Sequence, residues 1–187
     1  MIKSFLGFIF ELIKIVVISL VIIVPIRYFL IQPFYVKGAS MEPNFYDHDY
    51  LIVDEISFRF NQPKRGDIVV FKYPRNQQEY FIKRLIGLPN EKIQIKDGEV
   101  YIFNQENLLG KKIEEVYLNS NAKTYNLNNE TVSLANDEYY VLGDNRNFSK
   151  DSRSFGAVKK NLIVGRVLLR GWPFNKINLF LVPQYNY

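Results

Sequence analysis

The feature that most constrains this 187-residue chain is an almost entirely apolar stretch near its start, Phe5–Ile31. The uninterrupted core of this stretch, Ile15–Ile26, contains 12 residues, with Glu11 and Lys14 before it and Arg27 after it. A helix that crosses a bilayer needs about 20 apolar residues, and long charged side chains near its ends can extend to the interfaces. The stretch therefore predicts a transmembrane helix.

We place this helix at about residues 5–29, within an N-terminal anchor of residues 1–31. A cleaved signal peptide and a helix buried in a protein core are the two alternatives. Lys3 fits the charged start of a signal peptide, but Val36-Lys37-Gly38 matches a small-residue cleavage site only loosely. The charge rule does not fix the orientation, because basic residues stand on both sides of the apolar core.

From residue 34 onward, short runs of β-branched and aromatic residues alternate with turn residues, which is the pattern of β-strands. The segment Lys96-Asp97-Gly98 joins two such runs in a way that is typical of a hairpin. We therefore expect a mostly β protein, in which the transmembrane helix is followed by an antiparallel β-sheet domain. The predicted strands are 50–54, 67–72, 80–86, 92–95, 99–103, 138–142 and 162–169.

Residues 104–137 interrupt this pattern, because eight of these 34 residues are Asn and apolar residues are sparse among them. We interpret the segment as an insertion, either a small β cap or a long loop. It divides the β domain into a first part, residues 32–103, and a second part, residues 138–187.

The composition restricts the chemistry that such a chain can perform. It has no cysteine and a single histidine, His48. The absence of cysteine excludes a disulfide framework, a thiol nucleophile and a Cys-ligated zinc site. A Ser-His-Asp triad would depend on His48. Hydrolytic chemistry would otherwise need a different base or a metal ion held mainly by carboxylates.

Two residues have the chemistry of a nucleophile and a base. Ser40 follows the helix within Gly38-Ala-Ser-Met-Glu-Pro43, where small residues let a peptide approach. A serine hydroxyl is a weak nucleophile that needs a neighbouring base. Lys83 shares one face of a predicted strand with Phe81 and Leu85, where burial would lower its pKa from about 10.4 toward neutrality. Alone, Ser40 has an ordinary explanation as a turn residue and Lys83 as a residue of an edge strand.

A dense polar segment, Gly143-Asp-Asn-Arg-Asn-Phe-Ser-Lys-Asp-Ser-Arg153, directly follows the strand that ends at Leu142. Its charged and hydroxyl side chains can form a hydrogen-bonded network that holds one wall of a site rigid. A solvated turn and a calcium loop are the alternatives, but Asp144, Asn145 and Asp151 do not follow the EF-hand spacing.

Taken together, these segments resemble the bacterial type I signal peptidases, which are membrane-anchored endopeptidases with a Ser/Lys dyad. After the membrane helix, Ser40-Met41-x-Pro43 is similar to the nucleophile motif of that family. Residues 65–71 are similar to its strand motif, Lys83-Arg84-x-x-Gly87-x-Pro89 to its general-base motif and residues 143–153 to its final motif. The resemblance covers most of the chain, and four motifs in order after a membrane helix make it specific.

The resemblance implies a role for each matching residue. Ser40 would attack the scissile carbonyl, Lys83 would be the general base and Ser149 would orient the lysine through a hydrogen bond. The Ser40 N–H would supply one oxyanion donor, whereas Gly38 leaves the second donor unidentified. Residues that would support the active site through ionic contacts and hydrogen bonds are Arg84, Asp144, Asp151 and Arg153.

The resemblance also implies the substrate, which is the signal peptide of an exported preprotein, cut after an Ala-x-Ala-like site. Shallow apolar pockets would reject larger side chains, and the substrate would add as a strand near residues 34–38 and 80–83. No metal ion or other cofactor is implied. The residues expected to bind the substrate are Phe34, Val36, Met41, Leu51, Val70 and Ile82.

Membrane lipids are the other partner that the resemblance implies. Aromatic residues near the C-terminus would enter the interface and basic residues would lie near lipid phosphates. The net charge of +5 suits an anionic bilayer, and no aromatic-basic motif indicates nucleic acid. We expect a single-pass protein of the bacterial plasma membrane with its catalytic domain on the extracytoplasmic side. The interfacial residues would be Trp172, Phe174, Phe180, Lys159, Lys160, Arg170 and Lys176.

Two rival hypotheses explain part of the same pattern. The self-cleavage domains of SOS-type repressors share a Ser/Lys dyad on a related β fold, but they lack a membrane helix. A catalytically inactive, anchored β domain would not need Ser40, Lys83 and Ser149 together.

Overall fold

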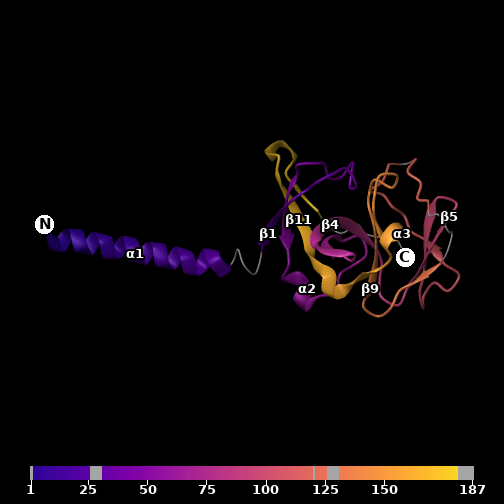
Figure 1. Cartoon of the computed structure of the whole chain (residues 1–187), viewed down its shortest axis with the longest axis horizontal. Coiled ribbons are helices and arrows are strands. Elements are labelled where there is room, and N and C mark those ends of the chain that lie inside the picture. Colours follow the sequence, from indigo (N-terminus) through magenta and orange to yellow (C-terminus); the bar gives the residue numbers. More distant parts are fainter. Residues whose placement is uncertain (1, 26–30, 120, 126–130, 181–187) are drawn as a thin grey trace.

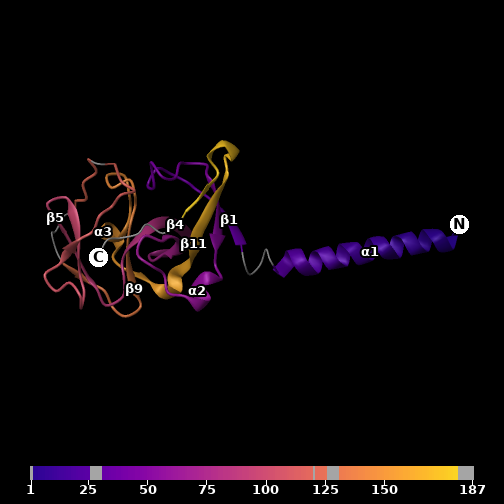
Figure 2. The same ribbon diagram turned by 180° about the vertical axis from the view of Figure 1, so that it is seen from behind.

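The computed structural model describes residues 2–25, 31–119, 121–125 and 131–180, and it consists of a long N-terminal helix and a β-rich body (Figure 1). The view from behind shows the same separation between the helix and the body (Figure 2). The end of the predicted transmembrane helix, residues 26–29, lies outside the described residues.

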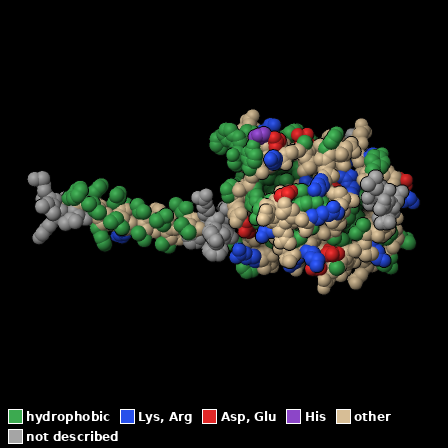
Figure 3. Space-filling model, in the orientation of Figure 1, with side chains coloured by type: hydrophobic (Ala, Val, Ile, Leu, Met, Phe, Trp, Pro, Cys, Tyr) green, Lys and Arg blue, Asp and Glu red, His purple; other side chains and the backbone are tan. Residues whose placement is uncertain are grey.

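Helix α1, Ile2–Pro25, has the length and composition to cross a bilayer. Its 24 residues extend about 36 Å at 1.5 Å per residue. Within it, Gly7–Val24 has a mean hydropathy of 2.7 and none of it is buried inside the protein. Apolar side chains cover its surface in Figure 3. This exposure contradicts the core-helix alternative, because a core helix buries its apolar side chains, whereas a membrane helix and a signal sequence both fit.

The larger of two sheets has eight strands in the order β1-β2-β11-β3-β4-β9-β10, with β12 paired to β11. Every pairing is antiparallel, which confirms the mostly β, antiparallel fold. The alternating burial of β2 explains its position, because one face of this strand enters the core and the other remains accessible. The strands are β1 (Ile31–Tyr35), β2 (Tyr50–Asp54), β3 (Ile68–Tyr73), β4 (Asn76–Gly87), β9 (Glu138–Leu142), β10 (Val158–Lys159), β11 (Ile163–Trp172) and β12 (Asn178–Leu179).

The smaller sheet has the order β7-β6-β5-β8, and its strands are β5 (Lys92–Lys96), β6 (Glu99–Phe103), β7 (Lys111–Lys112) and β8 (Val132–Ser133). The sequence placed the first two strands in the large domain and only residues 104–137 in an insertion. The structure instead pairs strands from both sides of position 103, because the apolar side chains of β5 and β6 pack against Ile113 and Leu134. The domain boundaries themselves stay a prediction.

Two core clusters flank the central strands of the large sheet and hold the loops that carry the polar motifs. One cluster joins the segment after β1, through Met41 and Phe45, to β2, β3 and β11. The other joins β3, β4 and β9. The polar segment 143–153 starts where β9 ends, next to β4. The short helices are α2 (Ser57–Phe60), α3 (Ser152–Phe155), η2 (Lys160–Leu162) and η3 (Phe174–Lys176).

Candidate active site

The structure brings Ser40 and Lys83 together, although 43 residues separate them in the sequence. Lys83 Nζ donates a hydrogen bond of 2.7 Å to Ser40 Oγ. Ser40 lies in the loop between β1 and β2, whose base is closed by backbone hydrogen bonds between Val36 and Asp49 and between His48 and Val36. Lys83 lies in the middle of the large sheet, because β4 pairs with both β3 and β9. The expected nucleophile and the expected base are therefore in direct contact.

Lys83 has the environment of a neutral amine. Its side chain is only 3% exposed, and its second hydrogen bond is to the Ile82 carbonyl at 2.8 Å. Burial lowers the pKa of Lys83 to about 8, and the carboxylates of Asp151 and Asp144 oppose this shift. A lysine with this pKa is partly unprotonated near neutral pH, so it can accept a proton from the serine hydroxyl.

The polar segment 143–153 fixes the backbone on both sides of the nucleophile. The Asn145 N–H donates to the Ser40 carbonyl at 3.1 Å, and its side-chain amide donates to the Ala39 carbonyl at 3.0 Å. A Cβ on Gly143 would come within 2.5 Å of both the Ser40 carbonyl oxygen and Ser149 Cβ. Glycine at this position therefore permits the close approach of the two loops.

Asp151 is fully buried and organises this segment from within. Its carboxylate accepts two hydrogen bonds of 2.8 Å from the Arg153 guanidinium and one of 3.0 Å from the Gly143 N–H. It also accepts from the Arg153 N–H as the N-cap of α3. This bidentate pair gives the loop one defined geometry.

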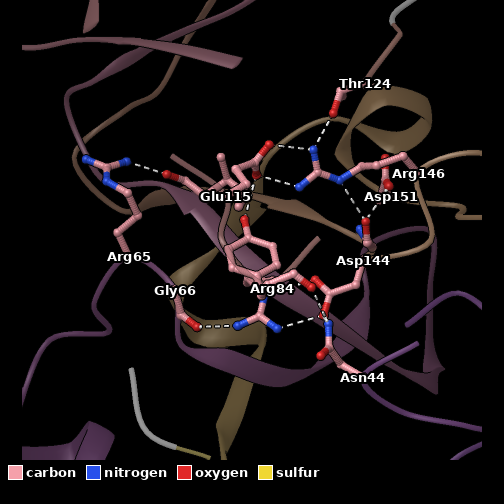
Figure 4. Close-up of polar contacts among 12 residues, drawn as sticks. Asn44, Arg65, Gly66, Arg84, Glu115, Thr124, Asp144, Arg146 and Asp151 are labelled. Carbon is pink, nitrogen blue, oxygen red and sulfur yellow. Dashed lines mark hydrogen bonds and ion pairs between the residues drawn. The ribbon is translucent and has the colours of Figure 1, made fainter. Parts of the chain in front are cut away.

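Arg84 and Asp144 form a second buried bidentate pair, with distances of 2.8 and 2.7 Å (Figure 4). Arg84 also donates to the Gly66 carbonyl at 3.1 Å, and its guanidinium lies 3.8 Å from the centre of the Tyr117 ring. Asn44 donates at 2.9 Å to Asp144 Oδ2, which also accepts from Arg84. Arg84, the residue after Lys83, thus connects β4 to the polar segment 143–153 through Asp144. Asn44 joins the loop between β1 and β2 to the same carboxylate.

The sequence analysis missed a third buried ion pair, which connects the small sheet region to the site (Figure 4). Arg146 binds Glu115 through both ends of its guanidinium, and it also contacts Thr124 and donates to the Gly143 carbonyl at 3.0 Å. Tyr117 donates its hydroxyl proton to Glu115 as well. The polar composition of residues 104–137 was the only sequence signal for these contacts.

Ser149 lies beside the dyad but does not make the hydrogen bond that we expected. Its Oγ is buried and has no hydrogen-bond partner among the described residues. The predicted hydrogen bond between Ser149 and Lys83 is therefore absent from this structure, because Lys83 Nζ is directed to Ser40 and to the Ile82 carbonyl. Ser149 nevertheless approaches the same glycine, Gly143, that adjoins Ser40.

The backbone amide of the expected nucleophile is free to donate. Within the described part of the chain, the Ser40 N–H makes no hydrogen bond. The Gly38 N–H, in contrast, donates to Asp47 at 2.7 Å. Only the first of these amides is available to an oxyanion without a change in the loop.

A cavity of about 570 Å³ opens onto the dyad. Five of the six residues that we expected to bind substrate line it, and they come from β1, the segment after β1, β2, β3 and β4. Phe148, which is 77% exposed, and Lys150 of the polar segment also line it, and the sequence analysis missed both. The five expected residues are Phe34, Val36, Leu51, Val70 and Ile82.

Met41 is the expected pocket residue that the structure does not place in this cavity. Its side chain is fully buried and packs in the core cluster with Phe45 and Val53. The same cluster contains Val36, Leu51 and Val70, which line the cavity, so Met41 lies behind its wall. Met41 is thus absent from the cavity lining in this structure, and its contact with substrate stays a prediction.

The end of β11 and the helix η3 that follows it carry two exposed aromatic side chains. Trp172 and Phe174 are exposed, and their ring centres lie 4.6 Å apart. Two other residues expected at a membrane interface are instead structural. Phe180 packs on Phe45 at 4.3 Å, and Arg170 is buried in an ion pair of 2.8 Å with Asp49.

Among the described residues, no group of three or more His, Asp or Glu side chains is placed to hold a metal ion. The single histidine, His48, is exposed and pairs with Asp47.

Comparisons with known proteins identify the family of this chain. Residues 9–172 match the family model described as signal peptidase, peptidase S26. The chain is 40% identical over 174 residues to a signal peptidase I from Leptolyngbya laminosa, with coverage of 89% of this chain and 81% of the relative. It is 33% identical over 184 residues to the signal peptidase IB of Staphylococcus aureus, with coverage of 90% and 92%. A crystal structure of a signal peptidase I from Enterococcus faecalis covers 57% of this chain at 33% identity, with a TM-score of 0.46, and 97% of that chain is matched.

Proposed function

Because this chain belongs to the signal peptidase family, peptidase S26, and is a signal peptidase hydrolase, we propose that it cuts preproteins with a dyad of Ser40 and Lys83. The observation that carries this proposal is the hydrogen bond of 2.7 Å between Lys83 Nζ and Ser40 Oγ. It joins a weak nucleophile to a buried amine that can accept its proton.

The proposed reaction starts when neutral Lys83 takes the proton of Ser40 Oγ as this oxygen attacks the scissile carbonyl. The Ser40 N–H then donates to the oxyanion of the tetrahedral intermediate. Lys83 passes its proton to the leaving amine, which leaves an ester between Ser40 and the signal peptide. A water molecule that gives a proton to Lys83 hydrolyses this ester by the same route in reverse.

The residues around the dyad act in this proposal by fixing its geometry. Asp144 and Asp151 hold Arg84 and Arg153 in buried bidentate pairs, and they also draw the pKa of Lys83 upward against burial. Ser149 is the remaining proposed active-site residue. Its unpaired, buried hydroxyl is close enough to the loops of the site to donate or accept once substrate is bound.

The substrate cavity supports cleavage after small side chains in an Ala-x-Ala-like site. Its walls are Phe34, Val36, Leu51, Val70 and Ile82, which fill the space that large side chains would require. Since alternate residues of an extended peptide face the same way, the first and third residues before the cut would point to these walls. The second would point away from them.

Membrane attachment through α1 is also part of this proposal. The helix is long, apolar and fully exposed, so a bilayer would satisfy its side chains. We place the catalytic body on the extracytoplasmic side of a bacterial plasma membrane, where exported preproteins emerge. The exposed pair Trp172 and Phe174 suits contact with lipid at the interface.

The test is incubation of the detergent-solubilised protein with an Ala-x-Ala preprotein, followed by mass mapping of the products. The expected cut follows the second alanine, and Ser40→Ala and Lys83→Ala each abolish it while the circular dichroism spectrum is unchanged. Lys83→Arg is also expected to be inactive, because arginine does not lose its proton. Wild-type-like cleavage by any of these variants would exclude the dyad.

A further inference from the structure

A second cavity, of about 560 Å³, adjoins the nucleophile loop just beyond Ser40. Glu42 and Asn147 line this second cavity, whereas Ser40 and Phe148 line the first. Successive Cα atoms are about 3.8 Å apart, so these lining residues of the two cavities are close neighbours along the chain. The nucleophile loop and the polar segment therefore each contribute residues to both cavities.

The lining of the second cavity is suited to a peptide backbone. Its walls come from the nucleophile loop, from the polar segment 143–153 and from a segment between β7 and β8. Asn119, Asn121 and Asn147 supply amide groups, each of which can both donate to and accept from an extended chain. The first cavity also has charged residues in its lining, but most of its walls from the large sheet are apolar or aromatic.

The charges of this lining are compensated, with one exception. Lys123 pairs with Glu99 at 2.8 Å, and Arg146 and Asp144 each belong to a buried ion pair. Glu42 is half-buried, and within the described ranges its carboxylate has neither an ion pair nor a hydrogen bond. The second cavity therefore has an unpaired negative charge two residues from the nucleophile.

We propose that the second cavity binds the first residues of the mature protein, those after the cut, and that Glu42 favours substrates with Lys or Arg among them. This inference rests on the proposed function, since it assigns the other half of the same substrate. An endopeptidase must hold the chain on both sides of the scissile bond, and the first cavity can take only the residues before the cut. The two halves of the substrate then meet different surfaces, one apolar and one polar and acidic.

The test uses two preproteins that are identical except for Lys or Glu at the second position after the cut. For the wild-type enzyme, kcat/KM is expected to be about five-fold higher with Lys, the ratio that a partly screened ion pair provides. Glu42→Gln should reduce this ratio to about one, and Glu42→Lys should invert it. Because each ratio compares two substrates on one enzyme, the fraction of correctly folded variant cancels.

Two further variants make the test specific. Asn121→Asp adds a negative charge at an exposed position on the opposite wall, so it should increase the preference for Lys. Glu106→Gln removes an exposed carboxylate outside both cavities and should leave the ratio unchanged. An equal ratio for the wild type and Glu42→Gln would overturn the inference. If the wild type cleaves neither preprotein, the proposed function fails instead.

Discussion

The buried position of Lys83 predicts how cleavage depends on pH. Lys83 must be neutral to accept the proton of Ser40, and burial holds its pKa at about 8. The neutral fraction is then about one-tenth at pH 7 and about nine-tenths at pH 9. We therefore expect kcat/KM to rise about ten-fold between these two values and to level off above them, since this ratio reports ionisations of the free enzyme.

The assay is the initial rate of preprotein cleavage at low substrate concentration, measured from about pH 6 to pH 10 in one buffer mixture. A His48→Gln variant is the control, because His48 is exposed and its partner Asp47 contacts the nucleophile loop. The control should give the same midpoint as the wild type. A midpoint near 10.4, the value for a solvated lysine, would refute the role of burial, and a midpoint that changes in the control would contradict the assignment to Lys83.

Three variants test other parts of the account. Lys83→Met should raise the free energy of unfolding at pH 7 by about 1–3 kcal/mol, which urea denaturation measures. The reason is that burial disfavours the charged form of Lys83. A pKa that falls from 10.5 to about 8 corresponds to a cost of about 3 kcal/mol for that form. For the wild type, the unfolded chain binds more protons than the folded one between these pKa values, so stability should rise with pH across that window. Gly143→Ala should lower kcat/KM about 100-fold with little loss of secondary structure, because the new methyl group would displace the Ser40 carbonyl. Retained activity would contradict the close contact between Gly143 and the Ser40 carbonyl. Glu115→Ala leaves Arg146 buried without its carboxylate and should cost about 3 kcal/mol of stability, whereas a loss below about 1 kcal/mol would show that this ion pair is not desolvated.

Local patterns in the sequence were sufficient for the β fold, whereas the proposed dyad depended on motif resemblance. Strand β2 alternates between buried and accessible residues, so its pattern could be read directly. The contact between Ser40 and Lys83 came from motif resemblance, because nothing in the spacing of two residues 43 positions apart fixes their distance. Their hydrogen bond depends on the antiparallel arrangement of the large sheet.

The features that the sequence analysis missed depend on long-range packing. The small sheet recruits β5 and β6 from before the expected insertion, and the Glu115–Arg146 pair joins segments 31 residues apart. Met41 shows a different limit, because a residue next to the expected nucleophile in sequence can be buried in the core without lining the cavity. Ser149 shows a third limit of the sequence analysis. A motif can identify a residue as part of a site, but it does not determine which hydrogen bonds that residue makes.

The absence of cysteine from this chain allows the most direct test of the dyad. Lys83→Cys should be inactive, and alkylation of this single cysteine with 2-bromoethylamine restores an amine one sulfur atom away from the lysine structure. We predict that the alkylated variant regains cleavage of the Ala-x-Ala preprotein, with a pH midpoint below that of the wild type because sulfur lowers the pKa of the amine. Alkylation with a neutral reagent of similar size should not restore cleavage. Activity of unmodified Lys83→Cys, or an alkylated amine that stays inactive in a folded protein, would contradict the assignment of Lys83 as the general base.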